Sequence, residues 1–333
     1  MHILSPSFRD PAGFLFVDEG KLLRQINHVY ADIFKAVESS GLLSELMDAG
    51  LLISHQSIKH PGLDPQQCAQ VIEPDFIPFI SYPYEWSFSQ LKDAALLTLD
   101  IQQRALEKGF TLKDASVYNI QFSGHTPVFI DSLSFDHYVE GQPWIGYRQF
   151  CQHFLAPLAL MSKVDMSLNR LLQLHIDGIP LDLAQSMLRG KSYLSLGLLS
   201  HIKLHAQSQK KYQSHGKKVQ KASVKLYQVK GIVDHLRSCI SSLSLPQVST
   251  EWGDYYNHTN YTNDSFSRKE ILVKGVIDQT NPSVVWDLGA NDGTFSRLAD
   301  NGERTVISCD IDPVAVEKHY LRLKKDDEGS SKR

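Results

Sequence analysis

The chain has 333 residues, of which 42% are hydrophobic and 21% charged, an ordinary globular composition with room for about two domains. Its formal net charge of -3 argues against a dedicated nucleic-acid-binding protein. No apolar run approaches the roughly 18 residues that a membrane-spanning helix needs. We therefore expect no membrane span, and we do not expect nucleic acid as a partner.

The first residues and the cysteines indicate the cellular compartment. Met1–Leu4 is followed by Ser5 and Pro6, so the apolar stretch of a secretory signal is missing. The four cysteines lie far apart and form no C-x-x-C pair, which argues against a disulfide framework and against a zinc site. We expect a cytoplasmic protein without a resident metal.

Residues 1–200 mix helix and strand patterns and form the first predicted domain. Phe14–Arg24 has the pattern of a hairpin. Ser89–Leu106 predicts a long amphipathic helix, and Gly109 suits the position just past its end. Between them, Glu73–Trp86 is punctuated by prolines and predicts an extended hinge beside a ligand cleft. His153 lies in an apolar helical segment, and we expect a buried core histidine there rather than a ligand.

An order of elements typical of one enzyme class follows the long helix. Leu112–Phe122 contains Asp114 and Asn119 in the pattern Asp-x-x-x-x-Asn, and after a turn Pro127–Ile130 leads into Asp131. This order resembles the catalytic core of protein-kinase-like phosphotransferases. The resemblance implies that Asp114 orients an acceptor hydroxyl. It also implies that Asn119 and Asp131 hold Mg against the phosphates of ATP.

The same segment departs from the kinase pattern. Leu112–Lys113 stands where that family has His-Arg, Ser132–Leu133 stands where it has Phe-Gly, and no glycine-rich nucleotide loop lies upstream. One alternative is a kinase-like fold that serves as a scaffold or recognition module. Another is that the polar residues make only local hydrogen bonds. The possible phosphate-facing cations are Lys21 and Arg24, and the acids that could pair with one of them are Glu38 and Glu45.

The middle of the chain is rich in lysine. Residues 203–230 contain many lysines and not one Asp or Glu. Arginine, the preferred reader of bases, is absent there. We interpret residues 201–249 as a lysine-rich helical linker between two domains rather than as a nucleic-acid or membrane surface.

A strand, a glycine turn and a helix near the C-terminal end are the pattern most informative about function. Val284–Asp287 predicts a buried parallel strand, and Gly289 and Gly293 bracket a tight turn. Glycine suits a backbone with positive φ that a ligand must approach closely. A second strand, Thr305–Cys309, ends at Asp310, which in a βαβ unit would reach the ribose hydroxyls of a nucleoside.

The turn discriminates between two kinds of ligand. A dinucleotide loop of the form G-x-G-x-x-G places a pyrophosphate at a helix N-terminus. Here Asn291 replaces the middle glycine, and Asp292 adds a negative charge. That charge opposes an anionic ligand but tolerates a sulfonium with an amino-acid tail.

The pattern Asp-x-Gly-x-Asn-x-Gly, with an acid after the next strand, closely resembles the cofactor motifs of class I S-adenosylmethionine (SAM) dependent methyltransferases. The chain as a whole resembles the N-terminal portion of a bacterial-type family of such enzymes. The resemblance implies SAM as cofactor and transfer of its methyl group to an acceptor that stays unknown. The cofactor-binding residues that it implies are Asp287, Gly289, Asn291, Gly293 and Asp310.

The predicted methyltransferase domain, residues 250–333, is short. A seven-stranded doubly wound domain needs roughly 150–170 residues, whereas this segment offers two strands and two helices after the turn begins. We expect an incomplete Rossmann-like domain, from a fragment or a truncated chain, in which methyl transfer is impaired. The alternative is that the first domain covers the exposed edge of this sheet. Aromatic residues between Trp252 and Phe266 precede an amphipathic helix around Ile271–Ile277. They could fold over the cofactor or pack that helix on the sheet.

Taken together, the sequence predicts a kinase-like mixed α+β domain followed by the start of a Rossmann-like, doubly wound α/β sheet. The favoured function is SAM-dependent methyl transfer, for which no catalytic base is assigned. The alternatives are a kinase-like phosphotransferase that binds ATP and Mg, and a non-catalytic binding or scaffold module. The oligomeric state is left open.

Overall fold

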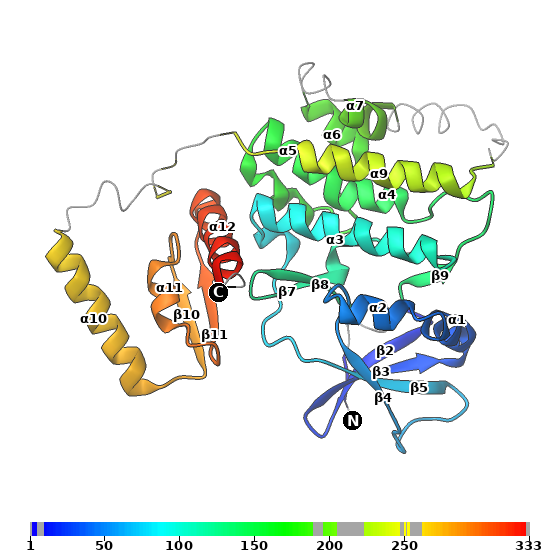
Figure 1. Cartoon of the computed structure of the whole chain (residues 1–333), viewed down its shortest axis with the longest axis horizontal. Helices are drawn as coiled ribbons and strands as arrows, with labels where there is room; N and C mark the ends of the chain where they lie inside the picture. Colours follow the sequence, from blue (N-terminus) through cyan, green and yellow to red (C-terminus); the bar gives the residue numbers. More distant parts are fainter. Residues whose placement is uncertain are drawn as a thin grey trace.

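The computed structural model describes residues 2–4, 10–188, 196–204, 223–246, 250, 252–253 and 262–330. The fold is mixed α/β and consists of two units that lie side by side (Figure 1). The first unit runs from β1 to α9. The second contains α10, β10, α11, β11 and α12. None of the helices in the described part of the chain combines the length and apolar character needed to cross a membrane.

A five-stranded antiparallel sheet begins the first unit, with the order β1-β2-β3-β5-β4. The predicted hairpin is confirmed, because β2 and β3 join through Glu19 and Gly20, both with positive φ. Side chains alternate between the two faces of a strand, so Leu23 packs in a small outer cluster while Ile26 faces the main core. The elements are β1 (His2–Ile3), β2 (Gly13–Asp18), β3 (Lys21–Asn27), α1 (His28–Ser39), α2 (Leu42–Asp48), β4 (His55–Ile58) and β5 (Cys68–Pro74).

Helix α3 (Phe88–Glu107) runs through the centre of the main core. It begins with a capping box, in which the Ser87 hydroxyl accepts from the N–H of Gln90 and the Gln90 side chain accepts from the N–H of Ser87. Gly109 follows the helix with a φ of 83°, a conformation that glycine adopts without strain. The predicted long helix is confirmed.

Short strands after α3 carry the predicted polar residues. β6 (Phe110–Leu112) pairs with β9 (Phe135–His137), and β7 (Ile120–Ser123) forms a hairpin with β8 (Thr126–Phe129). Helices then cover α3. They are α4 (Tyr147–Phe150), a π-helical turn at Cys151–Leu155, α5 (Ala156–Lys163), a 3-10 segment at Met166–Gln173, α6 (Leu181–Met187), α7 (Leu196–Leu198), a π-helical turn at Leu199–Leu204 and α9 (Leu226–Ser242).

The predicted linker needs a correction over α9. Val229, Val233, Leu236 and Ile240 repeat at helical spacing, and all four are fully buried in the main core. α9 lies along α3 (Figure 1). Residues 226–242 are therefore an integral helix of the first unit. Most of the lysine-rich stretch, residues 205–222, lies outside the described residues.

The second unit is a βαβ arrangement preceded by a long helix. β10 (Val284–Leu288) and β11 (Thr305–Cys309) pair in parallel, as predicted. Burial of the first strand was predicted wrongly. Val284 is 47%, Trp286 55% and Leu288 75% exposed, because α11 packs on the other face of this two-stranded sheet. The helices are α10 (Asn263–Thr280), α11 (Thr294–Ala299) and α12 (Pro313–Ser330).

Candidate functional site

The glycine turn connects β10 to α11 at the carboxyl end of the two parallel strands. Gly289, Asn291 and Gly293 all have positive φ, of 84°, 51° and 74°. The N–H groups of Gly289 and Ala290 donate to the carbonyl of Cys309, at 2.8 and 2.9 Å. No atom lies within 4 Å of the point where a Cβ of Gly289 would be. Gly289 therefore presents bare backbone to open space, as a close-approaching ligand requires.

Asp310 lies beside this turn and holds its backbone. Its Oδ2 accepts from the N–H of Asn291 at 2.8 Å, and its Oδ1 accepts from the N–H of Asp312 at 2.8 Å. The side-chain amide of Asn291 donates to the carbonyl of Trp252 at 2.6 Å. A carboxylate has about four lone-pair sites, so each oxygen of Asp310 retains capacity for a further hydrogen bond. The structure thus brings Asp310 and Asn291 together.

The two other acids of the turn have local partners. Asp287 Oδ2 accepts from the hydroxyl of Ser296 on α11, at 2.6 Å. Asp292 Oδ1 accepts from the N–H and hydroxyl of Thr294, at 3.2 and 2.7 Å, and its Oδ2 pairs with Arg322 at 2.8 Å. The charge of Asp292, which the sequence suggested would face a ligand, is therefore balanced by a guanidinium.

Gly293 is required by packing rather than by ligand approach. A Cβ at this residue would lie 1.6 Å from Nδ1 of His319 on α12. The His319 ring lies against the turn, with Nδ1 3.0 Å from the carbonyl of Asp292. Burial lowers the pKa of His319. The glycine pair thus divides into two roles, an open position at Gly289 and a helix contact at Gly293.

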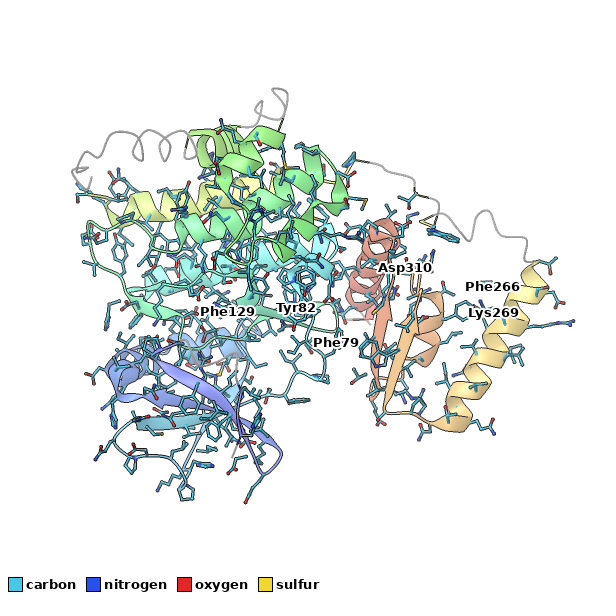
Figure 2. The ribbon with its side chains drawn as sticks, turned by 180° about the vertical axis from the view of Figure 1, so that it is seen from behind. Phe79, Tyr82, Phe129, Phe266, Lys269 and Asp310 are labelled. Carbon is cyan, nitrogen blue, oxygen red and sulfur yellow. The ribbon has the colours of Figure 1, made fainter. Side chains whose placement is uncertain are left out.

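Among the predicted aromatic residues before the strand, Phe266 packs against α11. The rings of Phe266 on α10 and Phe295 on α11 have centroids 5.8 Å apart, and the Lys269 ammonium lies 4.4 Å from the Phe295 centroid. Phe266 and Lys269 lie far from the first unit (Figure 2). Residues 254–261, which include most of the predicted aromatic segment, lie outside the described residues.

In the first unit, Asp131 and Asn119 meet at one hydroxyl. Ser134 Oγ donates to Asp131 Oδ2 at 2.5 Å and lies 3.2 Å from the Asn119 amide nitrogen. Arg24 on β3 pairs with Asp131 Oδ1 at 2.7 Å. Burial raises the pKa of Asp131, but the Arg24 guanidinium, Ser134 and the N–H of Leu133 outweigh it and hold that pKa below its usual range.

Asp114, the third predicted residue, is held by different partners. Its Oδ1 accepts from the N–H of Ser116 at 3.0 Å and from the Gln149 side chain at 2.8 Å. Gln149 also accepts from the N–H of Ala115, at 2.7 Å. The neighbouring Lys113 lies over the Tyr30 ring, 4.1 Å from its centroid. Asp114 is fixed in its loop through these local bonds.

The two predicted cations, Lys21 and Arg24, pair with different acids. Lys21 pairs with Glu73 at 2.8 Å, and its hydrogen bond lowers the pKa of that carboxyl. Glu45 pairs with Arg104 and Lys108, so it serves neither predicted cation. Arg24 alone reaches the predicted site, through Asp131. Of the two acids that the sequence left open as partners, Glu45 pairs instead with cations of α3 and its C-cap.

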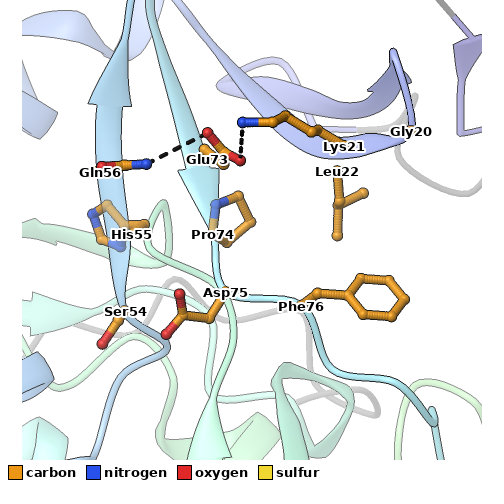
Figure 3. Close-up of a pocket in the computed structure, with 10 residues that line it drawn as sticks. All are labelled: Gly20, Lys21, Leu22, Ser54, His55, Gln56, Glu73, Pro74, Asp75 and Phe76. Atoms are coloured by element: carbon orange, nitrogen blue, oxygen red, sulfur yellow. Dashed lines mark hydrogen bonds and ion pairs between the residues drawn. The ribbon is translucent and has the colours of Figure 1, made fainter. Parts of the chain in front are cut away.

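A cavity of about 510 Å³ lies beside the start of β3, the start of β4 and the end of β5 (Figure 3). His55, which lines it, has its Nδ1 3.5 Å from the hydroxyl of Ser132, the residue after Asp131. Burial lowers the pKa of His55. One wall is the start of the predicted hinge. The lining residues are Gly20, Lys21, Leu22, Ser54, His55, Gln56, Glu73, Pro74, Asp75 and Phe76.

His153 is the buried histidine that was predicted. Its side chain is 2% exposed, and its Nδ1 accepts from the N–H of Val117 at 3.4 Å. No group of three or more His, Cys, Asp or Glu within the described ranges is arranged to hold a metal ion.

Sequence reasoning missed Ser134, His319 and Arg322. Ser134 follows Asp131 by three residues, a spacing at which a serine commonly bonds an aspartate locally. His319 and Arg322 lie three apart on one helix and so point in similar directions. Both signals are weak by themselves, because they gain meaning only when a partner is known.

The comparisons with known proteins give one family and one weak structural likeness. No family model matches the chain. Nodulation protein NoeA of Rhizobium meliloti (strain 1021) is 34% identical over 326 residues, which are 95% of this chain and 68% of that protein. The structure of vaccinia related kinase 3 matches with a TM-score of 0.35 and 12% identity, covering 73% of this chain and 85% of its own, a likeness too low to argue from. Because the identity with NoeA extends over nearly the whole chain, this protein belongs to the NoeA family.

Proposed function

We propose that the protein binds SAM at the carboxyl ends of β10 and β11 and serves SAM-dependent methyl transfer. One observation carries the proposal. The Asp310 carboxylate is bonded to the N–H of Asn291 at 2.8 Å, next to the uncovered backbone of Gly289. Ligands of open α/β sheets bind at this edge of the strands. A nucleoside there would meet bare backbone and a carboxylate with lone pairs left for a ribose diol.

The helix that follows the turn supports SAM over a dinucleotide. A pyrophosphate binds dinucleotide folds at the N-terminus of this helix. In this chain the Asp292 carboxylate accepts from the N–H of Thr294 in the first turn of α11. The Asp292 carboxylate thus occupies the position at the start of α11 where a pyrophosphate would bind. A sulfonium ligand needs no such place.

The described residues would act on the donor side of the reaction. They would bind and orient the cofactor, which in this class of reaction supplies the methyl group. Holding donor and acceptor in line is the main source of rate in a direct displacement. We assign no catalytic base and no acceptor. The name of NoeA connects that relative with nodulation, and it does not choose among acceptors.

Two glycine variants test the cofactor site. Gly289 and Gly302 both have positive φ, and neither has an atom within 4 Å of a would-be Cβ. Alanine at either position costs about 1–2 kcal/mol of backbone strain. Only Gly289→Ala places a methyl group at the proposed site. We expect it to weaken S-adenosylhomocysteine binding about tenfold or more, a change of about 1.4 kcal/mol, in isothermal titration calorimetry.

Gly302→Ala, in the loop before β11, is the matched control and should bind as the wild type does. Equal affinities in the two variants would show that the ligand does not bind next to Gly289. A wild-type chain that binds neither SAM nor S-adenosylhomocysteine would overturn the proposal as a whole.

We propose as a second candidate that the cavity of the first unit binds a nucleotide such as ATP with Mg, in a kinase-like fold. The observation that favours it is the shared Ser134 hydroxyl, which joins the would-be metal ligands Asn119 and Asp131 near the cavity. Arg24 weakens this candidate, since Mg would have to displace the guanidinium from Asp131. The unit could equally hold a nucleotide without transferring phosphate.

Calorimetry with ATP, with and without Mg, tests this candidate. We expect Asp131→Asn, which keeps the side-chain size, to abolish any Mg-dependent part of the affinity. Asp136→Asn on β9 is the control, because Asp136 accepts from the N–H of the adjacent His137. Absence of ATP binding to the wild type would eliminate the candidate.

A further inference from the structure

Helix α12 contacts the first unit with one face. Glu317, Tyr320 and Lys324 repeat at spacings of three and four, which places them in one row along the helix. Glu317 accepts from the N–H and the hydroxyl of Ser89, at 2.9 and 2.5 Å. Tyr320 donates to Asp93 Oδ2 at 2.7 Å, and Lys324 pairs with the same oxygen at 2.5 Å. This row joins α12 to the N-terminal end of α3, beside which α12 lies (Figure 1).

Glu317 completes the start of α3 from the other unit. Helix α3 is 20 residues long, but its first turn contains no acidic residue. The N-terminus of a helix carries partial positive charge and unpaired N–H groups. Glu317 is 9% exposed and lies against this end, where it satisfies the N–H of Ser89. The contact is thus specific in both charge and hydrogen bonding.

A second face of α12 holds the glycine turn. His319 contacts the carbonyl of Asp292, and Arg322 pairs with the Asp292 side chain at 2.8 Å. A side chain at Gly293 would collide with His319. The backbone of the turn is therefore packed directly on the helix, and a shift of α12 moves the support of the turn.

The second unit has little core of its own. Its larger buried apolar side chains among the described residues are Ile307, Val314 and Tyr320, and the Tyr320 ring packs edge-on against Phe122 of the first unit, with centroids 6.0 Å apart. A sheet of two strands is at best marginally stable unless another element packs on it. The contacts of α12 with the first unit therefore provide support that the turn lacks locally.

We infer that docking of α12 on α3 positions the turn at Asn291–Gly293, and that Glu317 is its principal positioning residue. The effect on cofactor affinity rests on the function proposed above. The effect on the order of the turn does not. The first unit is then a structural requirement of the site in the second.

Hydrogen exchange of the full chain, read by mass spectrometry, tests the inference. We expect Glu317→Ala to accelerate exchange of the amides from Asn291 to Arg297 by about tenfold, since opening of the turn becomes easier. Alanine suits a helix interior. The control is Asp278→Ala, which removes a carboxylate that pairs with Lys274 one turn away on α10. Wild-type protection in Glu317→Ala would overturn the inference.

Two further measurements keep the outcome decisive. Tyr320→Phe removes only the hydroxyl that bonds Asp93 and should shift exchange in the same direction by less, even if Glu317→Ala folds poorly. S-adenosylhomocysteine titration separates the two proposals. If Glu317→Ala loses protection but the wild-type chain does not bind S-adenosylhomocysteine, the positioning role of Glu317 is supported and the proposed cofactor site is excluded. Binding that is equal in wild type and Glu317→Ala, with unchanged protection, would remove the positioning role alone.

Discussion

Asp131 and Arg24 form a charged pair in the interior of the first unit. The side chains are 18% and 12% exposed, and their atoms approach to 2.7 Å. Taking two charges out of water is costly unless hydrogen bonds satisfy them. Ser134 and Leu133 supply such bonds to Asp131. The buried Nε of Arg24 has no hydrogen-bond partner among the described residues. Arg24, Ser134 and Leu133 together therefore fix the position of the Asp131 carboxylate.

His153 makes stability depend on pH. Burial lowers its pKa to about 4 from an ordinary value of 6.5. As the pH falls from 6.5 toward 4, the unfolded chain takes up a proton that the folded chain refuses, so the folded state loses stability. The loss reaches about 3 kcal/mol at pH 4. We expect His153→Gln to show a shallower decline of its urea midpoint between pH 6.5 and pH 4 than the wild type.

His137→Gln, a change at an exposed histidine on β9, is the control for that series. Its pH profile should run parallel to that of the wild type. A profile of His153→Gln that is also parallel would mean that His153 does not titrate differently in the folded and unfolded chains.

At the scale of elements, the helix after α4 continues through a proline. Pro157 has no N–H to donate and would clash with a regular preceding turn. The chain instead forms a π-helical turn at Cys151–Leu155, and α5 begins at Ala156 with Pro157 in its first turn. The ring therefore lies where a missing N–H has little effect. An apolar run that a proline breaks in sequence is in fact a nearly continuous buried rod.

The role of α9 as core helix is testable at one position. Leu236 is fully buried against the main core, whereas Tyr227 on the same helix is 68% exposed. Leu236→Ala should lower the free energy of unfolding by about 2–5 kcal/mol, because it leaves a cavity as well as losing apolar contact. Tyr227→Ala should change it by less than about 0.5 kcal/mol. Chemical denaturation measures both. Equally small losses of stability in both variants would contradict the role of α9 as a core helix.

At the scale of the whole molecule, the two units are joined by polar contacts between residues far apart in sequence. Glu317 reaches Ser89 across 228 positions, and Arg170 reaches the carbonyl of Ile311 at 3.5 Å. Phe79 of the first unit contacts the exposed Trp286 of β10 edge-on, with ring centroids 5.4 Å apart. The face of β10 that carries Trp286 therefore lies near the proline-rich segment of the first unit.

Exposed apolar side chains gather on the second unit. Besides the three residues of β10, Ile271 is 71%, Leu272 69% and Val276 61% exposed on α10. The amphipathic pattern of that helix correctly predicted its existence but not its burial. An amphipathic helix forms from its local pattern, while burial depends on which element comes to lie against it.

Local sequence patterns predicted several elements and the order of the polar motifs. Ser89–Leu106 predicted α3, Phe14–Arg24 predicted the hairpin, and the parallel strands lie on either side of the glycine turn and its helix, as the pattern predicted. Each of these signals depends on residues a few positions apart, where propensity, capping and turn chemistry act directly.

The partners of those motifs depend on the tertiary structure, because they lie on other elements. It placed Arg24 on Asp131, His319 on Gly293 and Glu317 at the start of α3, and it buried α9 while leaving one face of β10 uncovered. Such contacts join side chains that are separated by tens to hundreds of residues. They arise only when whole elements pack together, so no local pattern of one sequence contains them.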